Sequence, residues 1–133
     1  MSITRCAILG LLTLLAVVPV RAQQSDAARS SRTCFLSDQF QNWRAADAQT
    51  IYIRVRPQRF FRLDLANPCP ILTSPGAQLI TRFRGKRQVC SPLDWDLSIH
   101  QWGGGASAQC AVQAMTPLSP SEVASLPPRL RPQ

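Results

Sequence analysis

The sequence lacks most of the residues from which catalytic centres are built. It contains a single histidine, His100, so no second imidazole can act as general base or metal ligand. Its cysteines form no CxxC pair, which argues against a structural zinc site and a thioredoxin-like redox motif. The run 103–105 is all glycine, but it lacks the spacing and the following lysine of a phosphate-binding loop, so we interpret it as a turn. We therefore expect no metal, no cofactor and no catalytic residue.

An apolar N-terminal segment predicts export. Residues 1–5 carry one positive charge, residues 6–20 are apolar, and Val20-Arg21-Ala22 has short side chains where signal peptidase requires them. Residues 1–22 are therefore interpreted as a cleaved secretory signal, because the apolar run is too short to span a membrane. The segment has no twin arginine, and Cys6 precedes the apolar run instead of ending it as a lipobox cysteine would. We expect a periplasmic or secreted protein with no transmembrane segment in the mature chain.

Acidic residues and lysine are scarce in the predicted mature chain. Cleavage leaves 111 of the 133 residues, with 13 of the 15 cationic residues and all seven acids, for a formal charge of +6. Lys86 is the only lysine, and arginine suits bidentate contacts with carboxylates and phosphates. The excess of arginine favours anionic partners, although a basic surface can also serve solubility alone. An anionic envelope polymer or another exported protein is expected as a partner, and nucleic acid is not.

Short alternating runs predict one small antiparallel β domain. Apolar and polar residues alternate over the segments 51–55, 61–65, 79–83, 95–99 and 110–114. Proline, glycine and asparagine separate these runs, as turns in a β domain require. A chain of this length buries one core. We therefore expect a mainly β fold over residues 33–127, either a sandwich or a partly open barrel.

The first two runs predict a hairpin and its register. A three-residue loop pairs Val55 with Phe61 and aligns the apolar faces of the two strands, whereas a two-residue loop would oppose an apolar face to a polar one. The three-residue loop is therefore preferred. On the outer face, this register sets Arg54 directly opposite Arg62.

The two ends of the mature chain differ from the domain. Residues 23–32 are polar and aperiodic, so a disordered leader is expected. Ser119, Pro120 and Glu122 form a helix start, with a capping hydroxyl, proline at the first helical position and glutamate three residues after the cap. The helix is expected to end at the next prolines, and residues 128–133 to form a loose, basic, proline-rich tail.

Four cysteines remain after cleavage, which predicts two disulfides in an exported protein. They are Cys34, Cys69, Cys90 and Cys110. Of the three possible pairings we favour Cys69–Cys90 with Cys34–Cys110. The first bridge would join the loop after the second predicted strand to a later strand, and the second would tie the N-terminal segment to the last strand.

Several polar residues near the fourth run resemble parts of a hydrolase. Asp96, Ser98 and His100 point to one side of the predicted strand, but such neighbours lie about 6.5–7 Å apart and proton transfer needs about 2.6–3.2 Å. Asp94 and Asp96 have a separation that a glycosidase could use, yet nothing marks a sugar cleft. Salt bridges to arginine are the preferred interpretation of these acids, and a small hydrolase is the least favoured function.

Five arginines form a candidate anion-binding face. They are Arg54, Arg56 and Arg62 on the predicted hairpin, and Arg82 and Arg84 in the matching phase of a third strand. Like charges directly opposite each other destabilise a sheet, so the hairpin face requires a compensating anion. Either an acid such as Asp64, Asp94 or Asp96 supplies it, or an external phosphate or carboxylate does.

Two binding functions are expected from these features. The first is an exported, non-catalytic binding or envelope-associated protein that uses the arginine face for anionic ligands or polymers. The second is an inhibitor or accessory protein that binds another exported protein through loops near Trp43 or Trp102. Together with Trp95 these side chains could stack on a ligand, but tryptophans in a small β domain more often pack in the core or at its rim.

The mature chain resembles a family of small exported proteobacterial proteins, domain of unknown function 6491. The motifs that carry the resemblance are Cys34-Phe35, Asn42-Trp43-Arg44, 47–53, 61–65, Cys69-Pro70, 89–94 and 118–127. The family usually has tyrosine where this chain has Phe61, and a second acid where it has Ser121. The resemblance implies export, small size and the four-cysteine framework, and it implies no particular activity.

Overall fold

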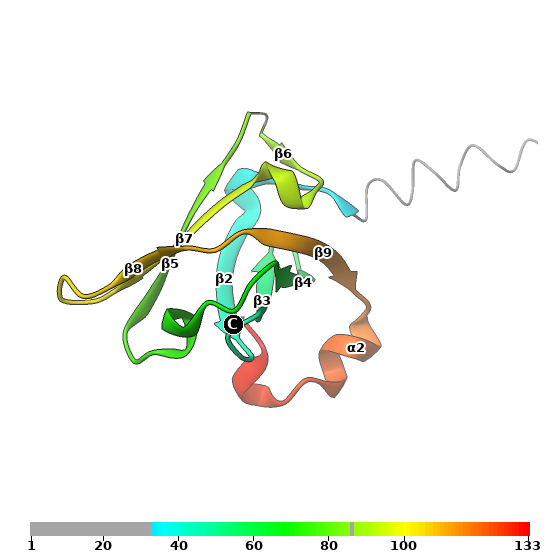
Figure 1. The fold of residues 1–133 in the computed structure, drawn as a ribbon. Coiled ribbons are helices and arrows are strands. Elements are labelled where there is room, and N and C mark those ends of the chain that lie inside the picture. Colours follow the sequence, from blue (N-terminus) through cyan, green and yellow to red (C-terminus); the bar gives the residue numbers. More distant parts are fainter. Residues whose placement is uncertain (1–32, 86) are drawn as a thin grey trace, which may run out of the picture.

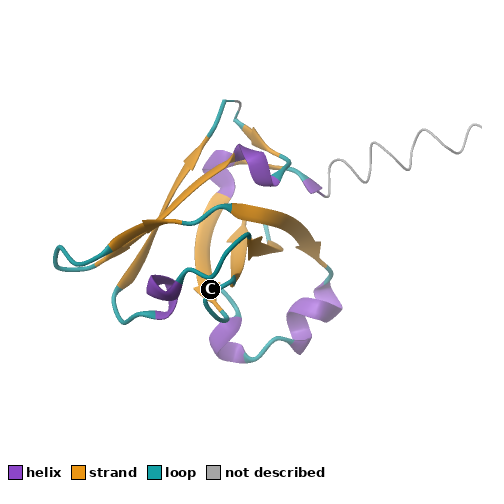
Figure 2. Cartoon of the chain, viewed as in Figure 1, coloured by secondary structure: helices purple, strands orange, loops and turns teal. Residues whose placement is uncertain are grey.

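The computed structural model of the protein describes residues 33–85 and 87–133. The predicted signal over residues 1–22, with Cys6, and the predicted leader over 23–32 lie outside the described residues. Within the described part, nine strands form three antiparallel sheets, with one short α-helix near the C-terminus (Figures 1 and 2). The predicted mainly β fold class is therefore confirmed.

The largest sheet contains four strands, and we call it the main sheet. Its strands are β2 (Phe40–Ala45), β3 (Thr50–Val55), β4 (Arg59–Leu65) and β9 (Val112–Leu118), in the order β2-β3-β4-β9. The first three are consecutive in sequence, and β9 adds to the free edge of β4 from the far end of the chain. This long connection brings the C-terminal region beside the first hairpin.

Two smaller sheets complete the fold. The second sheet has the order β5 (Ala77–Phe83), β7 (Trp95–Gln101), β8 (Ser107–Gln109), and the third pairs β1 (Phe35–Leu36) with β6 (Gln88–Val89). Short 3₁₀ helices connect the strands: η1 (Ser37–Gln39), η2 (Pro70–Thr73), η3 (Pro92–Asp94) and η4 (Pro128–Leu130). The predicted alternating runs lie in β3, β4, β5, β7 and β9, except that Cys110 and Ala111 belong to the β8–β9 connection.

The core lies between the main sheet and the second sheet. Its buried side chains include Ile51, Ile53, Val55, Phe61, Leu63 and Leu65 from the main sheet, Trp95, Leu97 and Ile99 from β7, and Phe35 and Val89 from the third sheet. Every buried residue of β3, β4 and β7 occupies the predicted apolar phase, because alternate side chains of a strand point to opposite faces. The other phase faces outward and carries Arg54 on β3 and Arg62 on β4.

The predicted register of the first hairpin is wrong, although its faces are correct. Ile53, and not Val55, lies opposite Phe61. The turn begins one residue earlier than predicted because the Arg56 amide donates to the main-chain oxygen of Gln39 (2.8 Å) and so pairs away from β4. Each residue of β3 therefore pairs with a β4 residue two positions earlier than predicted. A shift of two residues keeps the same apolar faces together. The burial pattern alone therefore could not distinguish the two registers.

This correction removes the predicted opposition of Arg54 and Arg62. Arg54 lies opposite Phe60, and Arg62 lies opposite Tyr52. No pair of like charges faces across β3 and β4, so the argument that such repulsion requires an anion does not apply.

Two disulfides are present as predicted, but the preferred pairing is wrong. The bridges are Cys34–Cys90, with Cα atoms 4.2 Å apart, and Cys69–Cys110, with Cα atoms 6.2 Å apart. The pairing of β1 with β6 explains the Cys34–Cys90 bridge, because Phe35 lies opposite Val89 and the two cysteines are the next residues in that antiparallel register. The pairing of β4 with β9 explains the second, since it brings the loop after β4 beside the chain just before β9.

The C-terminal helix begins as predicted. Helix α2 (Pro120–Ser125) is capped by Ser119, whose hydroxyl accepts from the Glu122 amide (3.3 Å) while the Glu122 carboxylate accepts from the Ser119 amide (2.7 Å). The helix ends at Leu126, just before the prolines. Among the described residues, no helix has the length and apolar character needed to cross a bilayer.

The tail after α2 is packed against the domain, contrary to the loose tail expected. Arg131 donates to the main-chain oxygens of Leu126 (2.8 Å) and Ala124 (2.6 Å), which are carbonyls that a helix end leaves without partners. The Asn42 side chain of β2 donates to the main-chain oxygen of Gln133 (2.8 Å). The chain therefore returns to the main sheet, and in Figure 1 its end lies beside β2 and β3.

Candidate functional site

A groove of about 960 Å³ lies between the outer face of the main sheet and the C-terminal segment. Its lining comes from the β3–β4 hairpin, the end of β9, helix α2 and the tail. The residues are Arg54, Gln58, Arg59, Phe60, Pro117, Leu118, Ser119, Pro120, Val123, Ala124 and Arg131. We call this site the basic groove, because three of its lining residues are arginine and none is acidic.

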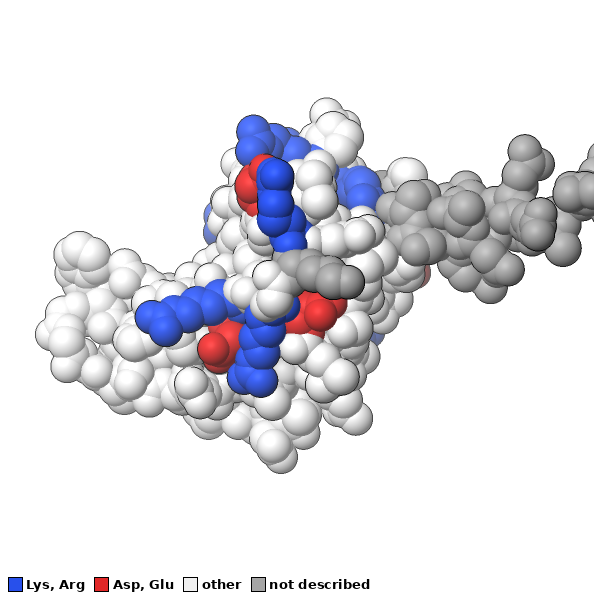
Figure 3. Space-filling model, turned by 90° about the horizontal axis from the view of Figure 1, so that it is seen from above, with Lys and Arg blue, Asp and Glu red and all other residues white. Residues whose placement is uncertain are grey.

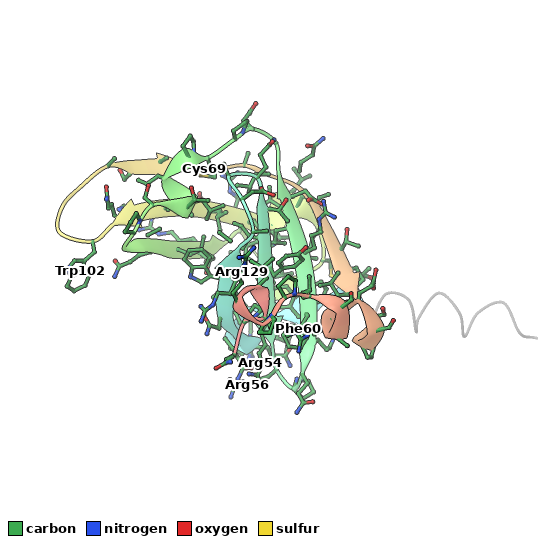
Figure 4. All side chains as sticks on the ribbon, turned by 90° about the horizontal axis from the view of Figure 1, so that it is seen from below. Arg54, Arg56, Phe60, Cys69, Trp102 and Arg129 are labelled. Atoms are coloured by element: carbon green, nitrogen blue, oxygen red, sulfur yellow. A yellow bond between two sulfur atoms is a disulfide. The ribbon has the colours of Figure 1, made fainter. Side chains whose placement is uncertain are left out.

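Arg54 is the arginine of the groove whose hydrogen bonding is incomplete. It projects from the outer face of β3, on the side of the sheet that the C-terminal segment covers (Figure 4). Its Nε atom is buried and has no hydrogen-bond partner among the described residues. A buried polar group without a partner costs about 1–3 kcal/mol, and more when it is charged. Arg54 therefore carries a donor that the described part of the chain leaves without an acceptor.

The other two arginines of the groove are held by main-chain oxygens. Arg59 donates to the main-chain oxygen of Cys34 (2.8 Å), and its guanidinium lies 5.2 Å from the centre of the Phe61 ring. Burial lowers the pKa of Arg59, although a guanidinium in a protein stays protonated. Arg131 is held by the carbonyls that end α2. The charge of Arg131 is thereby held near the groove, whereas the guanidinium of Arg59 lies on the side of β4 that Phe61 occupies.

The acid nearest in sequence to the groove wall is already engaged. Glu122 precedes Val123 on α2, and its carboxylate accepts from the amide and the hydroxyl of Ser119 (2.7 and 2.6 Å). These hydrogen bonds hold the pKa of Glu122 below its usual value. The ionised carboxylate of Glu122 therefore serves the helix cap.

Of the five arginines predicted as one anion-binding face, only Arg54 lines this groove. Arg62 is bound by Asp64, with Nη2 and Nε at 2.7 and 2.8 Å from the same carboxylate oxygen, and this contact raises the pKa of Arg62. Arg56 is exposed and donates to the main-chain oxygen of Asp38 (2.9 Å). Arg56 and Arg62 are therefore bound by separate partners.

The remaining two predicted arginines lie at a different sheet. Arg82 projects from β5, where it lies opposite Asp96, and Arg84 follows directly after β5, with its Nη2 atom 3.9 Å from the Asp96 carboxylate. In the view from above, cationic side chains lie beside acidic ones (Figure 3). The five arginines do not converge, because β5 pairs with β7 and not with the first hairpin.

Asp94 does not share a strand face with Asp96 as predicted. It ends η3, where its carboxylate accepts from the amides of Cys90 and Ser91 (2.8 Å each). These donors hold the pKa of Asp94 below its usual range. Asp94 therefore caps the turn next to the Cys34–Cys90 bridge.

The three strand residues that resemble parts of a hydrolase border a shallow hollow on the second sheet. Asp96, Ser98 and His100 line a depression of about 350 Å³ together with Arg82, Ser107 and Gln109. Within the part of the chain that the structure describes, no hydrogen bond joins any two of the three, so there is no nucleophile–base contact of the kind that a hydrolase requires.

The three tryptophans occupy different environments. Trp95 is buried and donates from Nε1 towards the sulfur of Met115 (3.4 Å), and Trp43 packs against the core. Trp102 is 77% exposed in the loop between β7 and β8, which contains the predicted glycine turn. Only Trp102 is therefore available as a contact residue for another molecule.

Sequence reasoning missed most of the groove. Phe60, Leu118 and Val123 are apolar residues that no predicted pattern assigned to one site, and Arg131 was placed in a loose tail. The available signal was Phe60, an aromatic residue in the outward phase of its strand. Its neighbours could not be identified, because they come from β9 and α2, far along the chain.

The fold and the groove define a class, a disulfide-stapled antiparallel β domain with a basic groove beneath its C-terminal segment. The chain belongs to the Family of unknown function (DUF6491), whose model matches residues 1–132. No curated protein and no solved structure matches the chain.

Proposed function

We propose that the protein is an exported, non-catalytic binding protein whose basic groove receives the anionic group of a ligand. The observation that carries this proposal is the buried Nε atom of Arg54, which lacks an acceptor in a groove lined by two further arginines. Charge-assisted hydrogen bonds from guanidinium to carboxylate or phosphate are about twice as strong as neutral ones. An anionic ligand would therefore offset the cost of leaving this donor unpaired.

The two disulfides support the exported location. Disulfides form and persist in the periplasm and outside the cell, and are rare in the reducing cytosol. The bridges join segments 56 and 41 residues apart in sequence. In our proposal the protein works in the periplasm or as a secreted protein.

Inorganic phosphate is the probe for the anionic site, with its binding followed by the melting temperature at low ionic strength. We expect a saturable rise, because a ligand that binds only the folded state stabilises it by about 2.7 kcal/mol at a hundredfold excess over Kd. Arg54→Gln should abolish this rise. In the parent protein, the rise in melting temperature should also become smaller as salt approaches physiological strength, where the Debye length is about 8 Å.

Arg62→Gln is the matched control, since it removes the same charge from the same hairpin outside the groove. Asp64 already neutralises Arg62, so this variant should keep the phosphate response. An equal response in Arg54→Gln and in the parent protein, or no saturable response in either, would contradict the proposal.

A second candidate function rests on Trp102. Exposed tryptophans are enriched among the residues that dominate protein–protein interfaces. The loop that carries Trp102 contains no charged residue, and its amide is held by the main-chain oxygen of Gly76 (3.0 Å). This arrangement favours an inhibitor or accessory protein that binds another exported protein through the β7–β8 loop. It is the weaker proposal, because one side chain is a small contact area.

A further inference from the structure

We infer that the ligand of the basic groove is an anionic amphiphile with one alkyl chain, bound with its carboxylate or phosphate at Arg54 and its chain between β9 and helix α2. This inference rests on the proposed function and names the class of ligand. Its basis is a row of three outward side chains that runs across the main sheet.

The row consists of Arg54 on β3, Phe60 on β4 and Leu118 on β9. Phe60 lies directly opposite Arg54 on one side and directly opposite Leu118 on the other. All three are half-buried and line the groove. Adjacent strands lie about 4.7–4.9 Å apart, so the row extends over about 10 Å from a cation to an aliphatic side chain.

The apolar end of the row is unusual for the outer face of such a sheet. Outward positions of antiparallel strands that face solvent are usually polar, as Arg62 and Thr116 are in the next row. Phe60 and Leu118 are instead half-buried and line the groove together with Val123 of α2. Their burial is incomplete, because the groove between these residues has a volume of about 960 Å³. Pockets for small molecules have about 300–1,000 Å³, so the space suits a ligand and not only a few waters.

The charges indicate which end of the ligand lies where. Arg54 is at one end of the row, and Arg59 and Arg131 line the same groove. On β2 the row continues to Asn42, whose side chain is engaged by the main-chain oxygen of Gln133. If the anionic head lies at Arg54, the apolar chain therefore extends towards β9 and α2 and not towards β2.

The distribution of the other arginines argues against a polymeric anion in this site. A long polyanion would be held by cations spaced along an open face, with phosphate or carboxylate contacts repeated along it. Arg62 is neutralised by Asp64, Arg82 lies opposite Asp96 on the second sheet, and Arg84, just after β5, is 3.9 Å from the Asp96 carboxylate. A groove with Arg54 beside an apolar wall fits a single charged head with one chain.

The experiment measures the affinity of the parent protein for acetate, hexanoate, octanoate and decanoate, each below its critical micelle concentration, by isothermal titration calorimetry. We expect the affinity to rise with each added methylene by up to about fourfold, the transfer value for a buried methylene, until the groove is filled. Decanol is the neutral probe of the same length and should bind at least about tenfold more weakly than decanoate, because it lacks the charge that Arg54 requires.

Two pairs of matched variants locate the site. Arg54→Gln should lose the preference for decanoate over decanol, whereas Arg62→Gln should keep it. Val123→Asp puts a negative charge in the groove and should weaken decanoate at least tenfold. Ser121→Asp adds the same charge two residues earlier on α2, outside the groove, and should bind as the parent does. Circular dichroism checks that each variant folds, and Val123→Thr replaces Val123→Asp if that variant does not.

The outcomes separate this inference from the proposed function. Equal affinity for acetate and decanoate, with loss in Arg54→Gln, would overturn the amphiphile and leave the anion site in place. A second outcome is that affinity rises with chain length to the same extent in the parent and in Arg54→Gln, and that decanol binds as tightly as decanoate. This outcome would overturn the anionic head and the proposed function together. No binding of phosphate or of any carboxylate would also overturn both.

Discussion

Two arginines of the first hairpin differ in their hydrogen bonding because different groups lie beside them. Arg54 and Arg62 project from the same face of one hairpin, yet Asp64 neutralises Arg62 while the Nε atom of Arg54 is buried without a partner. Surface ion pairs contribute about 0–1 kcal/mol, whereas an unpartnered buried donor costs about 1–3 kcal/mol. The second effect is the larger, so Arg54 is retained at a cost to stability, and the proposed function supplies a reason for it.

Asp94 makes stability depend on pH. Its pKa in the folded protein is below its usual value because two amides and the Ser91 hydroxyl donate to its carboxylate. The unfolded value is about 3.9, so the contribution is complete above that pH and is lost as pH falls through the folded-state pKa. Asp94→Asn should therefore lower the free energy of unfolding near neutral pH by about 1 kcal/mol, a typical value for a cap, and the difference should shrink in acid.

Urea unfolding of both proteins at a series of pH values measures this difference. Asp96→Asn is the control, because its ion pair with the exposed Arg84 is a long contact of 3.9 Å and should contribute little. A difference between Asp94→Asn and the parent that stays constant down to the acid limit would show that the carboxylate charge is not what holds the turn.

Element by element, the most direct link from sequence to structure is the start of helix α2. The hydroxyl of Ser119 and the carboxylate of Glu122 cap it reciprocally, with Pro120 at the first helical position. A six-residue helix has little stability of its own, so the cap and the contacts of the tail decide whether it forms. The groove depends on this element, because α2 is one of its walls.

Removal of the cap tests this dependence. Ser119→Ala should lower the free energy of unfolding by about 1 kcal/mol, the usual value for the loss of an N-cap hydroxyl. Ser121→Ala, two residues further on, removes a hydroxyl that lies 3.0 Å from the Ser119 hydroxyl but leaves the bonds between Ser119 and Glu122 in place. It should change stability by less than half of that amount, since alanine favours helix. Chemical denaturation of the two variants measures both values. Equal losses would mean that Ser119 acts only as a surface residue.

At the scale of the whole molecule, the disulfides hold together parts that are distant in sequence. One bridge fastens the β1–β6 ladder, and the other fastens the loop after β4 to the chain before β9. The chain-entropy treatment assigns about 4 kcal/mol to each closed loop of this length. Since a small domain has a net stability of about 5–15 kcal/mol, both bridges matter.

Non-reducing peptide mapping of the mature protein should find Cys34 joined to Cys90 and Cys69 joined to Cys110, with no free thiol among them. Double serine replacement of either pair should lower the free energy of unfolding by about 2–5 kcal/mol, because the unfolded chain regains its freedom. A peptide containing Cys34 linked to Cys110 would overturn this connectivity and with it the ladder register.

The amino-acid sequence by itself determined the features that depend on neighbouring residues. Alternation placed Ile51, Ile53 and Phe61 on the buried faces of their strands, and capping chemistry placed the start of α2. These patterns are local, because side chains alternate along a strand and a cap acts within one turn. The mainly β class and the presence of two disulfides followed from them and from the cysteine count.

Only the tertiary structure decided which distant segments meet. Two hairpin registers buried the same side chains, and the amide of Arg56 selected one of them by pairing with Gln39. Three cysteine pairings were compatible with the sequence, and the meeting of β1 with β6 and of β4 with β9 selected one. The basic groove arises in the same way, because Arg54, Leu118 and Val123 become neighbours only when β9 joins β4 and the chain turns back over the sheet. Contacts of such long sequence separation leave no periodic trace in the chain, which is why the groove could not be predicted.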